Sequence, residues 1–297
     1  MKSNLREFVK RIAPWLLLTL IIVVLASVVD WSSTDLIYSG QIRIIVFIVV
    51  AGVIYVIVQI LWSIIRAPKS PFSDGFITQI RHIGKFREQK RITAFIAEYD
   101  PDRFLAETDT FLKQEKLPKS LVRIASDNRA AAYFQKGELE RAIEIWTRTA
   151  EEEKEWREKY RLCDDLTRSV VHHNLCDVYL RNNQTEQARE HYNVLSEMQH
   201  ARNLTKAMKD WIKKVLLYFD AKFLMAEGKY GEALEPIRNS LQDENAWNKL
   251  GCHFDLAIIY EKLGDIESQK EHLEQVVVLG NKHYYAAIAC DKLLKIR

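Results

Sequence analysis

Two adjacent histidines and a nearby cysteine are the first side chains in this sequence that suggest chemistry. His172 and Cys176 are four residues apart, so a helix would place them on one face, and imidazole with thiolate is a donor pair that zinc accepts. Neither His173 nor any other residue supplies the remaining ligands at a conventional zinc spacing. We therefore interpret these three side chains as packing residues and predict neither a metal site nor a cofactor.

A run of charged residues at positions 151–161 is the second candidate, because paired carboxylates can perform acid–base catalysis. Acidic and basic residues are interspersed in this run. Glu153 with Arg157, and Glu155 with Lys159, have the i, i+4 spacing of helical ion pairs. The pattern predicts a long, solvated helix rather than a catalytic site.

The sequence contains no short motif of a known catalytic class. HExxH, GxxxxGK[ST], GxSxG and GxGxxG are all absent. Asn183 and Asn203 each begin an Asn-x-Thr glycosylation signal, but the topology inferred below places both in the cytoplasm, where the signal is inert. We predict that the protein is not an enzyme.

The overall composition excludes two further classes. A formal net charge of +3 over 297 residues is too small to indicate nucleic-acid binding. The four cysteines are far apart and form no CxxC pair, which argues against a disulfide scaffold and for reduced, buried thiols. They are Cys163, Cys176, Cys252 and Cys290.

Two long uncharged segments near the N-terminus predict a membrane anchor over residues 1–66. Ile12–Val29 and Ile44–Ile65 carry no charged residue, and about 20 apolar residues in a helix cross the hydrocarbon core. With interfacial Trp31 the expected transmembrane helices are 12–31 and 44–65. The alternative for the first segment is a signal peptide cleaved after Ala26, which would leave the second helix in place.

Basic residues flanking these segments predict the orientation. Lysine and arginine precede the first segment and follow the second, whereas the loop Asp30–Gln41 has none. The positive-inside rule then places both termini in the cytoplasm, as expected for a multi-pass protein of the bacterial inner membrane. Residues 67–91 form a basic juxtamembrane linker that would contact anionic lipid. The flanking basic residues are Lys2, Arg6, Lys10, Arg11, Arg66, Lys69, Arg81, Lys85, Arg87, Lys90 and Arg91.

Residues 92–297 predict an all-α domain made of repeated amphipathic helix pairs. Apolar residues recur at intervals of three and four, and four segments share one pattern. Each segment has a helix, a short turn containing Gly or Asn, and a second helix. The segments are 130–146, 175–192, 221–237 and 256–273.

The spacing of small residues within this pattern has a physical reason. The turn needs a left-handed residue, which glycine supplies at no steric cost and asparagine at a small one. Small residues seven positions before the turn and five after it let the paired helices approach closely. The expected turn residues are Gly137, Asn183, Gly228 and Gly264; the small residues are Ala130, Cys176, Ala221 and Ala257 before them, and Ala142, Ala188 and Ala233 after them.

This pattern resembles the tetratricopeptide repeat family, whose helix–turn–helix units stack into a solenoid. The turns are 46, 45 and 36 residues apart rather than 34, and Gln269 stands where the fourth unit should have alanine. A divergent earlier unit is expected around Ile92–Lys116, ending near Pro118. The helix at His283–Arg297 is expected to cap the stack.

The resemblance implies that the first helix of each pair lines a groove for a peptide or a partner protein. Carried over by position, the groove residues are Asn128, Phe134, His173, Asp177, Arg181, Tyr218, Lys222, Phe254 and Lys262. We therefore expect a membrane-anchored scaffold or adaptor that presents this groove at the cytoplasmic face. The alternative is a non-catalytic subunit of a membrane enzyme or transport complex, held to it through the transmembrane helices.

Overall fold

A computed structural model of the chain describes residues 81–160, 165–201, 204–242 and 249–296, together with Gly52 and Tyr55. The chain divides into two compact units, 1–81 and 82–297, and all the elements described below belong to the second. The expected transmembrane helices 12–31 and 44–65 lie outside the described residues, apart from Gly52 and Tyr55. Of the helices that are described, none combines the length and the apolar character needed to cross a bilayer.

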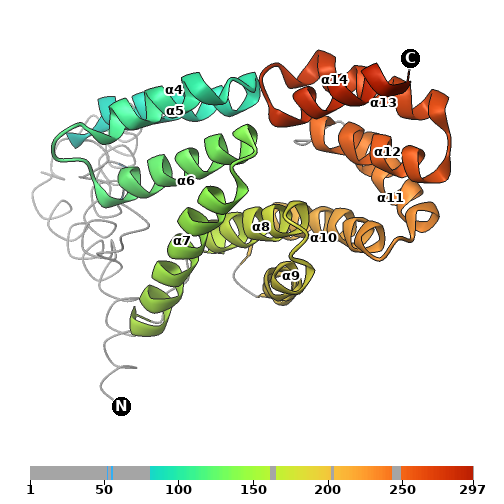
Figure 1. Cartoon of the computed structure of the whole chain (residues 1–297). Coiled ribbons are helices and arrows are strands. Elements are labelled where there is room, and N and C mark those ends of the chain that lie inside the picture. The colour runs from blue at the N-terminus through green and yellow to red at the C-terminus, as the bar shows by residue number, and fades with distance from the viewer. Residues whose placement is uncertain are drawn as a thin grey trace, which may run out of the picture. The chain divides into compact units, whose positions relative to one another are not determined.

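The second unit is built from helices alone over its described residues (Figure 1). In chain order they are α4 (Ile83–Ala94), the short 3-10 helix η1 (Phe95–Glu98), α5 (Pro101–Leu112), α6 (Lys119–Lys136), α7 (Leu139–Tyr160), α8 (Asp165–Arg181), α9 (Thr185–Gln199), α10 (Lys206–Ala226), α11 (Tyr230–Gln242), α12 (Lys249–Leu263), α13 (Ile266–Gly280) and α14 (Tyr284–Ile296). Helices that follow one another in sequence pack against each other throughout. The expected all-α repeat architecture is therefore present.

The four expected repeats correspond to the pairs α6–α7, α8–α9, α10–α11 and α12–α13. The residues at their turns have φ angles of 80° at Gly137, 57° at Asn183, and 78° at both Gly228 and Gly264. At the first turn the Gly137 N–H donates to the Phe134 carbonyl at 3.0 Å, and the Glu138 N–H to the Tyr133 carbonyl at 2.9 Å. The same two bonds recur at the other three turns. The predicted left-handed turns are confirmed.

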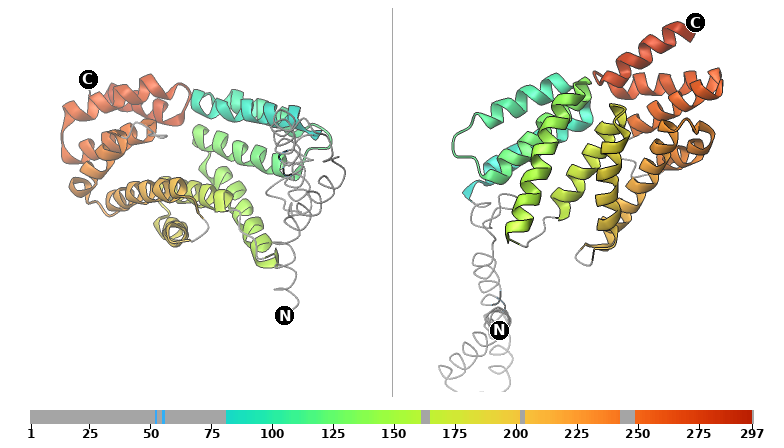
Figure 2. Two further views of the ribbon diagram at one scale, coloured as in Figure 1. Left: turned by 180° about the vertical axis from the view of Figure 1, so that it is seen from behind. Right: turned by 60° about the horizontal axis from the view of Figure 1, so that its bottom comes forward.

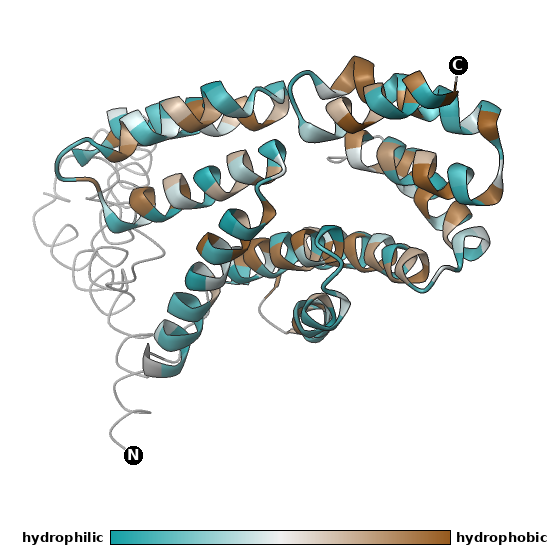
Figure 3. Cartoon of the chain, viewed as in Figure 1, coloured by the Kyte–Doolittle hydropathy of each residue, from teal (hydrophilic) through white to brown (hydrophobic). Residues whose placement is uncertain are grey.

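The predicted small residues are buried where paired helices meet. The set before the turns, Ala130, Cys176, Ala221 and Ala257, is at most 2% exposed, and the set after them, Ala142, Ala188 and Ala233, is 0% exposed. Gln269, which replaces alanine in the fourth pair, is also buried. The C-terminal half of α7 is largely hydrophilic (Figure 3), as its charge pattern predicts, but Glu153, which pairs with Arg157 at 3.4 Å, is buried rather than solvated.

The region before the first repeat differs from the expectation in its starting point. Helix α4 begins at Ile83, inside the segment 67–91 that was interpreted as a basic linker. It is followed by η1 and α5, which occupy the expected divergent unit around Ile92–Lys116. Pro118 lies immediately before α6, with an extended backbone that separates α5 from α6.

The last helix, α14, does more than cover the end of the stack. The turn between α13 and α14 lies beside the start of α5 in every view (Figures 1 and 2). Here the Lys282 N–H donates to the Tyr99 carbonyl at 3.0 Å. The junction of η1 and α5 near the start of this unit therefore contacts the turn before its last helix, which the repeat pattern did not predict.

Candidate functional site

The predicted groove residues lie on four alternate helices, α6, α8, α10 and α12. Most of them face the interior rather than solvent. Buried members are Asn128, His173, Asp177, Tyr218, Lys222 and Phe254; Phe134 is partly exposed, Arg181 is intermediate as a residue although its side chain is only 8% exposed, and Lys262 is exposed. The set is thus on the helices where it was expected, but it forms part of the packing between them.

Arg181 of α8 is the centre of this packing. Its guanidinium reaches across to α12 and donates to both carboxylate oxygens of Asp255, from Nη1 to Oδ1 and from Nη2 to Oδ2, the second at 2.9 Å. The Tyr218 hydroxyl of α10 donates to the same carboxylate at 2.6 Å. Asp255 is 0% exposed, so a fork-to-fork ion pair and one hydroxyl satisfy its charge. Three inner helices are joined at this point.

A second ion pair lies next to the first. The Lys222 ammonium of α10 donates to Asp177 of α8, and the Arg181 Nε lies 3.7 Å from the same Asp177 oxygen. Burial raises the pKa of Asp177, but Lys222 and Arg181 outweigh it and hold that pKa down at about 2. Burial lowers the pKa of Arg181, while Asp255 raises it further, to well above its ordinary value. The two ion pairs thus bring two basic and two acidic side chains together, and their formal charges balance.

Aromatic rings enclose this charged network. Tyr285 of α14 stacks on Phe254 of α12 with 4.1 Å between ring centroids and 5° between planes. The guanidinium of Arg181 lies 5.0 Å from the Tyr285 ring, within cation–π range. His173 packs beside Phe219, with 5.3 Å between ring centroids. The network is thereby shielded from water, which strengthens its ion pairs.

Sequence reasoning missed two members of this cluster, Asp255 and Tyr285. Asp255 had a detectable signal, because it is the single acidic residue in the apolar run Leu250–Tyr260. A lone carboxylate in such a run needs a buried partner. Tyr285 had no such signal, because its neighbours come from helices that are distant in sequence.

His172, which was interpreted as a packing residue, belongs to one of two equivalent histidine pairs among the described residues. His172 Nδ1 lies 2.9 Å from His191 Nδ1, and His253 Nδ1 lies 2.9 Å from His272 Nδ1. His191 stacks on Tyr179, and His272 stacks on Tyr260, each with 5.5 Å between ring centroids. Each tyrosine lies seven residues after the first histidine of its pair. Each pair joins the two helices of one repeat by a hydrogen bond. No cluster of three or more metal-ligating side chains occurs among the described residues.

Burial lowers the pKa of all four paired histidines. The pKa falls to about 3 for His172, where burial is reinforced by His191, Arg168 and Arg157, and to about 4 for His191. It also falls to about 4 for His253. The paired rings are therefore neutral at pH 7, which leaves the acceptor ring of each pair the lone pair that its hydrogen bond needs.

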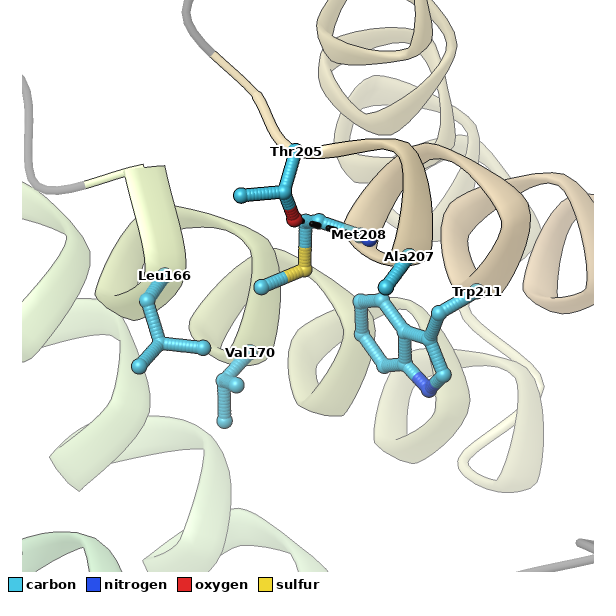
Figure 4. Close-up of a pocket in the computed structure, with 6 residues that line it drawn as sticks. All are labelled: Leu166, Val170, Thr205, Ala207, Met208 and Trp211. Atoms are coloured by element: carbon cyan, nitrogen blue, oxygen red, sulfur yellow. Dashed lines mark hydrogen bonds between the residues drawn. The ribbon is translucent and has the colours of Figure 1, made fainter.

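A separate small cavity of about 280 Å³ lies between the first turns of α8 and α10 (Figure 4). Its lining is Leu166, Val170, Thr205, Ala207, Met208 and Trp211. The Thr205 hydroxyl is occupied in accepting the Met208 N–H at 3.2 Å, as the cap of α10. The cavity therefore offers apolar contact and no acid, base or nucleophile.

Comparison with known protein families gives one match. Residues 250–278 match the model of a tetratricopeptide repeat, and this stretch covers most of α12 and α13. No curated protein matches the chain. Together with the repeated helix pairs, the match supports a relationship to the tetratricopeptide repeat family. Such repeats generally bind proteins and are generally non-catalytic, so the repeat indicates a role in protein–protein interaction.

Replacing Asp255 by alanine should strongly destabilise this unit. The substitution leaves the buried Arg181 without its counter-ion, and breaking a buried ion pair typically costs about 3–5 kcal/mol. The free energy of unfolding, measured by urea denaturation, should fall by this amount. Glu261→Ala is the control, because its pair with Lys292 is partly exposed and should contribute less than about 1 kcal/mol. An Asp255→Ala loss no greater than the control would contradict a central role for the network.

Stability should fall as the pH drops from 7 to 5. Unfolded histidine has a pKa of about 6.5, whereas the folded pKa values of His172 and His191 are about 3 and about 4. In this window the unfolded chain binds more protons, so acid favours unfolding, by up to about 1.4 kcal/mol per pH unit for each histidine.

Urea denaturation of the His172→Gln/His191→Gln variant should therefore show a flatter dependence on pH. His200→Gln, at an exposed position, is the matched control and should keep the wild-type slope. Equal slopes in both variants would show that the pair does not carry the effect.

Proposed function

We propose that this protein is a membrane-anchored adaptor whose helical repeats bind another protein at the cytoplasmic face. The observation that carries the proposal is the helix–turn–helix unit repeated four times with the same left-handed turn, one copy of which matches a tetratricopeptide repeat. A repeat of this kind hides its apolar flank only by stacking, and the stack leaves a long surface for a partner.

The proposed partner surface follows the inner helices α6, α8, α10 and α12, where the nine groove residues lie. Exposed Lys262 and partly exposed Phe134 are the members that a partner could touch directly. The buried members set the spacing of these helices through the ion pairs of Arg181 and Lys222. In this proposal the buried charges shape the surface, and the exposed residues contact the partner.

The proposed anchor consists of residues 1–66, with transmembrane helices at 12–31 and 44–65. Its support is the absence of charge from Ile12–Val29 and Ile44–Ile65 and the excess of basic residues on their outer flanks. The basic residues of 67–91 would hold the start of the helical unit near anionic lipid.

The second candidate function is that of a non-catalytic subunit in a membrane enzyme or transport complex. It is favoured by the length of the uncharged segments, which would leave two helices available for contact within the bilayer. The two candidates differ in which part of the chain holds the partner.

Exchanging residues 1–66 for an unrelated two-helix anchor should distinguish the candidates. An adaptor keeps its partner in affinity purification from detergent-solubilised membranes, because the repeats are intact. A subunit held through its transmembrane helices loses the partner. Purification with wild-type protein, followed by mass spectrometry, identifies the protein to be followed. If neither wild type nor the exchange variant retains any specific protein, the adaptor proposal fails.

A topology test can use Cys290, which is exposed, whereas Cys176 and Cys252 are buried. With the C-terminus in the cytoplasm, a membrane-impermeant maleimide should label Cys290 only after the cells are permeabilised. The Cys290→Ser variant controls for labelling at Cys163. Equal labelling of Cys290 in intact and permeabilised cells would place the repeats outside and refute the proposed orientation.

A further inference from the structure

The contact between the two ends of the helical unit has the form of a ligand in a binding site. The segment Asn281–Tyr284, here called the latch, joins α13 to α14. It makes polar contacts to three consecutive residues at the junction of η1 and α5. The Lys282 N–H donates to the Tyr99 carbonyl at 3.0 Å, the Asn281 side chain to the Glu98 carbonyl at 2.9 Å, and the Lys282 ammonium to Asp100 at 2.7 Å.

Aromatic rings follow these polar contacts. His283 is buried, packs edge-to-face on Tyr99 with 5.6 Å between ring centroids, and lies 6.1 Å from the Phe134 ring. Tyr284 also packs edge-to-face on Phe134 at 6.1 Å. Contacts of this kind contribute beyond the area that they bury. In the latch, a lysine is followed by two aromatic residues. The lysine is held by Asp100, and the two rings are held by Tyr99 and Phe134.

Gly137 completes the site that receives the latch. A β-carbon at this position would lie 3.1 Å from Cγ of Tyr284, which is closer than ordinary contact. Gly228 and Gly264 have the same left-handed φ angle, but a β-carbon there would meet nothing within 4 Å. Gly137 therefore has a second role besides the turn: it leaves room for the Tyr284 ring.

We propose that Glu98, Tyr99, Asp100, Phe134 and Gly137, here called the cradle, form a peptide-binding site that the chain's own latch occupies. The partner that fits the cradle is a protein segment with a lysine or arginine followed by two aromatic residues. It would bind by displacing the latch, which separates the two ends of the unit and opens the inner helices. That the partner is a protein rests on the proposed function. The contacts between latch and cradle are observed independently of that function.

The latch should suppress the binding of a separate peptide to the cradle. A tethered segment acts at an effective concentration in the millimolar range, so a free peptide of the same sequence competes poorly. Weakening the latch should remove this competition and reveal the cradle.

The first test measures the latch directly in the full-length protein. The Lys282 amide should exchange with deuterium at least tenfold faster in Gly137→Ala than in wild type, because the added methyl group pushes Tyr284 away. Gly228→Ala has the same unfavourable φ and is the matched control, with wild-type exchange at Lys282. Similar acceleration in both variants would mean that the turn alone, and not the contact with Tyr284, is responsible, and would overturn the proposal.

The second test measures peptide binding by fluorescence anisotropy, with a labelled synthetic peptide of residues 279–288 as the probe. The full-length Lys282→Ala/Tyr284→Ala variant should bind it at least tenfold more tightly than wild type. Adding Gly137→Ala to that variant should abolish the gain, whereas adding Gly228→Ala should not. A circular dichroism melt on each variant shows that the unit is folded.

Two outcomes of the peptide test would overturn the proposal. One is that no folded variant binds the peptide more tightly than wild type does. The other is a weakened-latch variant that dimerises in light scattering and binds no peptide, which would assign the cradle to a second copy of the chain. Neither outcome depends on whether a cellular partner is recovered by affinity purification, so the two proposals fail separately.

Discussion

The ion pair between Arg181 and Asp255 is the constraint on which the arrangement of the inner helices depends. Both groups are buried, and moving a charge out of water costs several kcal/mol unless its partner is placed well. The guanidinium fork meets both carboxylate oxygens, and Tyr218 satisfies one of them further. Because the fork accepts only one geometry, it fixes α12 relative to α8, although three helices lie between them in sequence.

The second pair, Asp177 with Lys222, lies beside the first, and the Arg181 Nε is 3.7 Å from the same Asp177. Alone, each ion would be an uncompensated charge in an interior lined by Phe254 and Tyr285. The formal charges of the four groups sum to zero, and each group has a hydrogen-bond partner. Buried polar networks of this type define one arrangement rather than adding much net stability. The expected open groove is therefore filled by the side chains that were expected to line it.

The two histidine pairs connect helices within one repeat rather than between repeats. They join the two helices within a repeat, whereas the charged network joins different repeats. His172 with His191 and His253 with His272 have the same spacing, the same nitrogen–nitrogen distance and the same stacked tyrosine. Two of the four repeats thus share a joint that the general helix–turn–helix pattern does not require. A repeat array of this kind combines local joints with a few contacts between distant repeats.

The sequence by itself determined the helical class, the four turns and the small residues at the helix pairs. These features depend on neighbours within about ten residues: Gly137 or Asn183 must adopt a positive φ, and Ala221 must be small, whatever the rest of the chain does. Only the tertiary structure decided that Arg181 meets Asp255, 74 residues away, and that Lys282 meets Asp100, 182 residues away. Whether two such residues meet depends on the sum of the small rotations between successive repeats. No local sequence pattern encodes that sum. For this reason the residues of the inner face could be named from the sequence, whereas their burial and the contact between the ends of the unit could not.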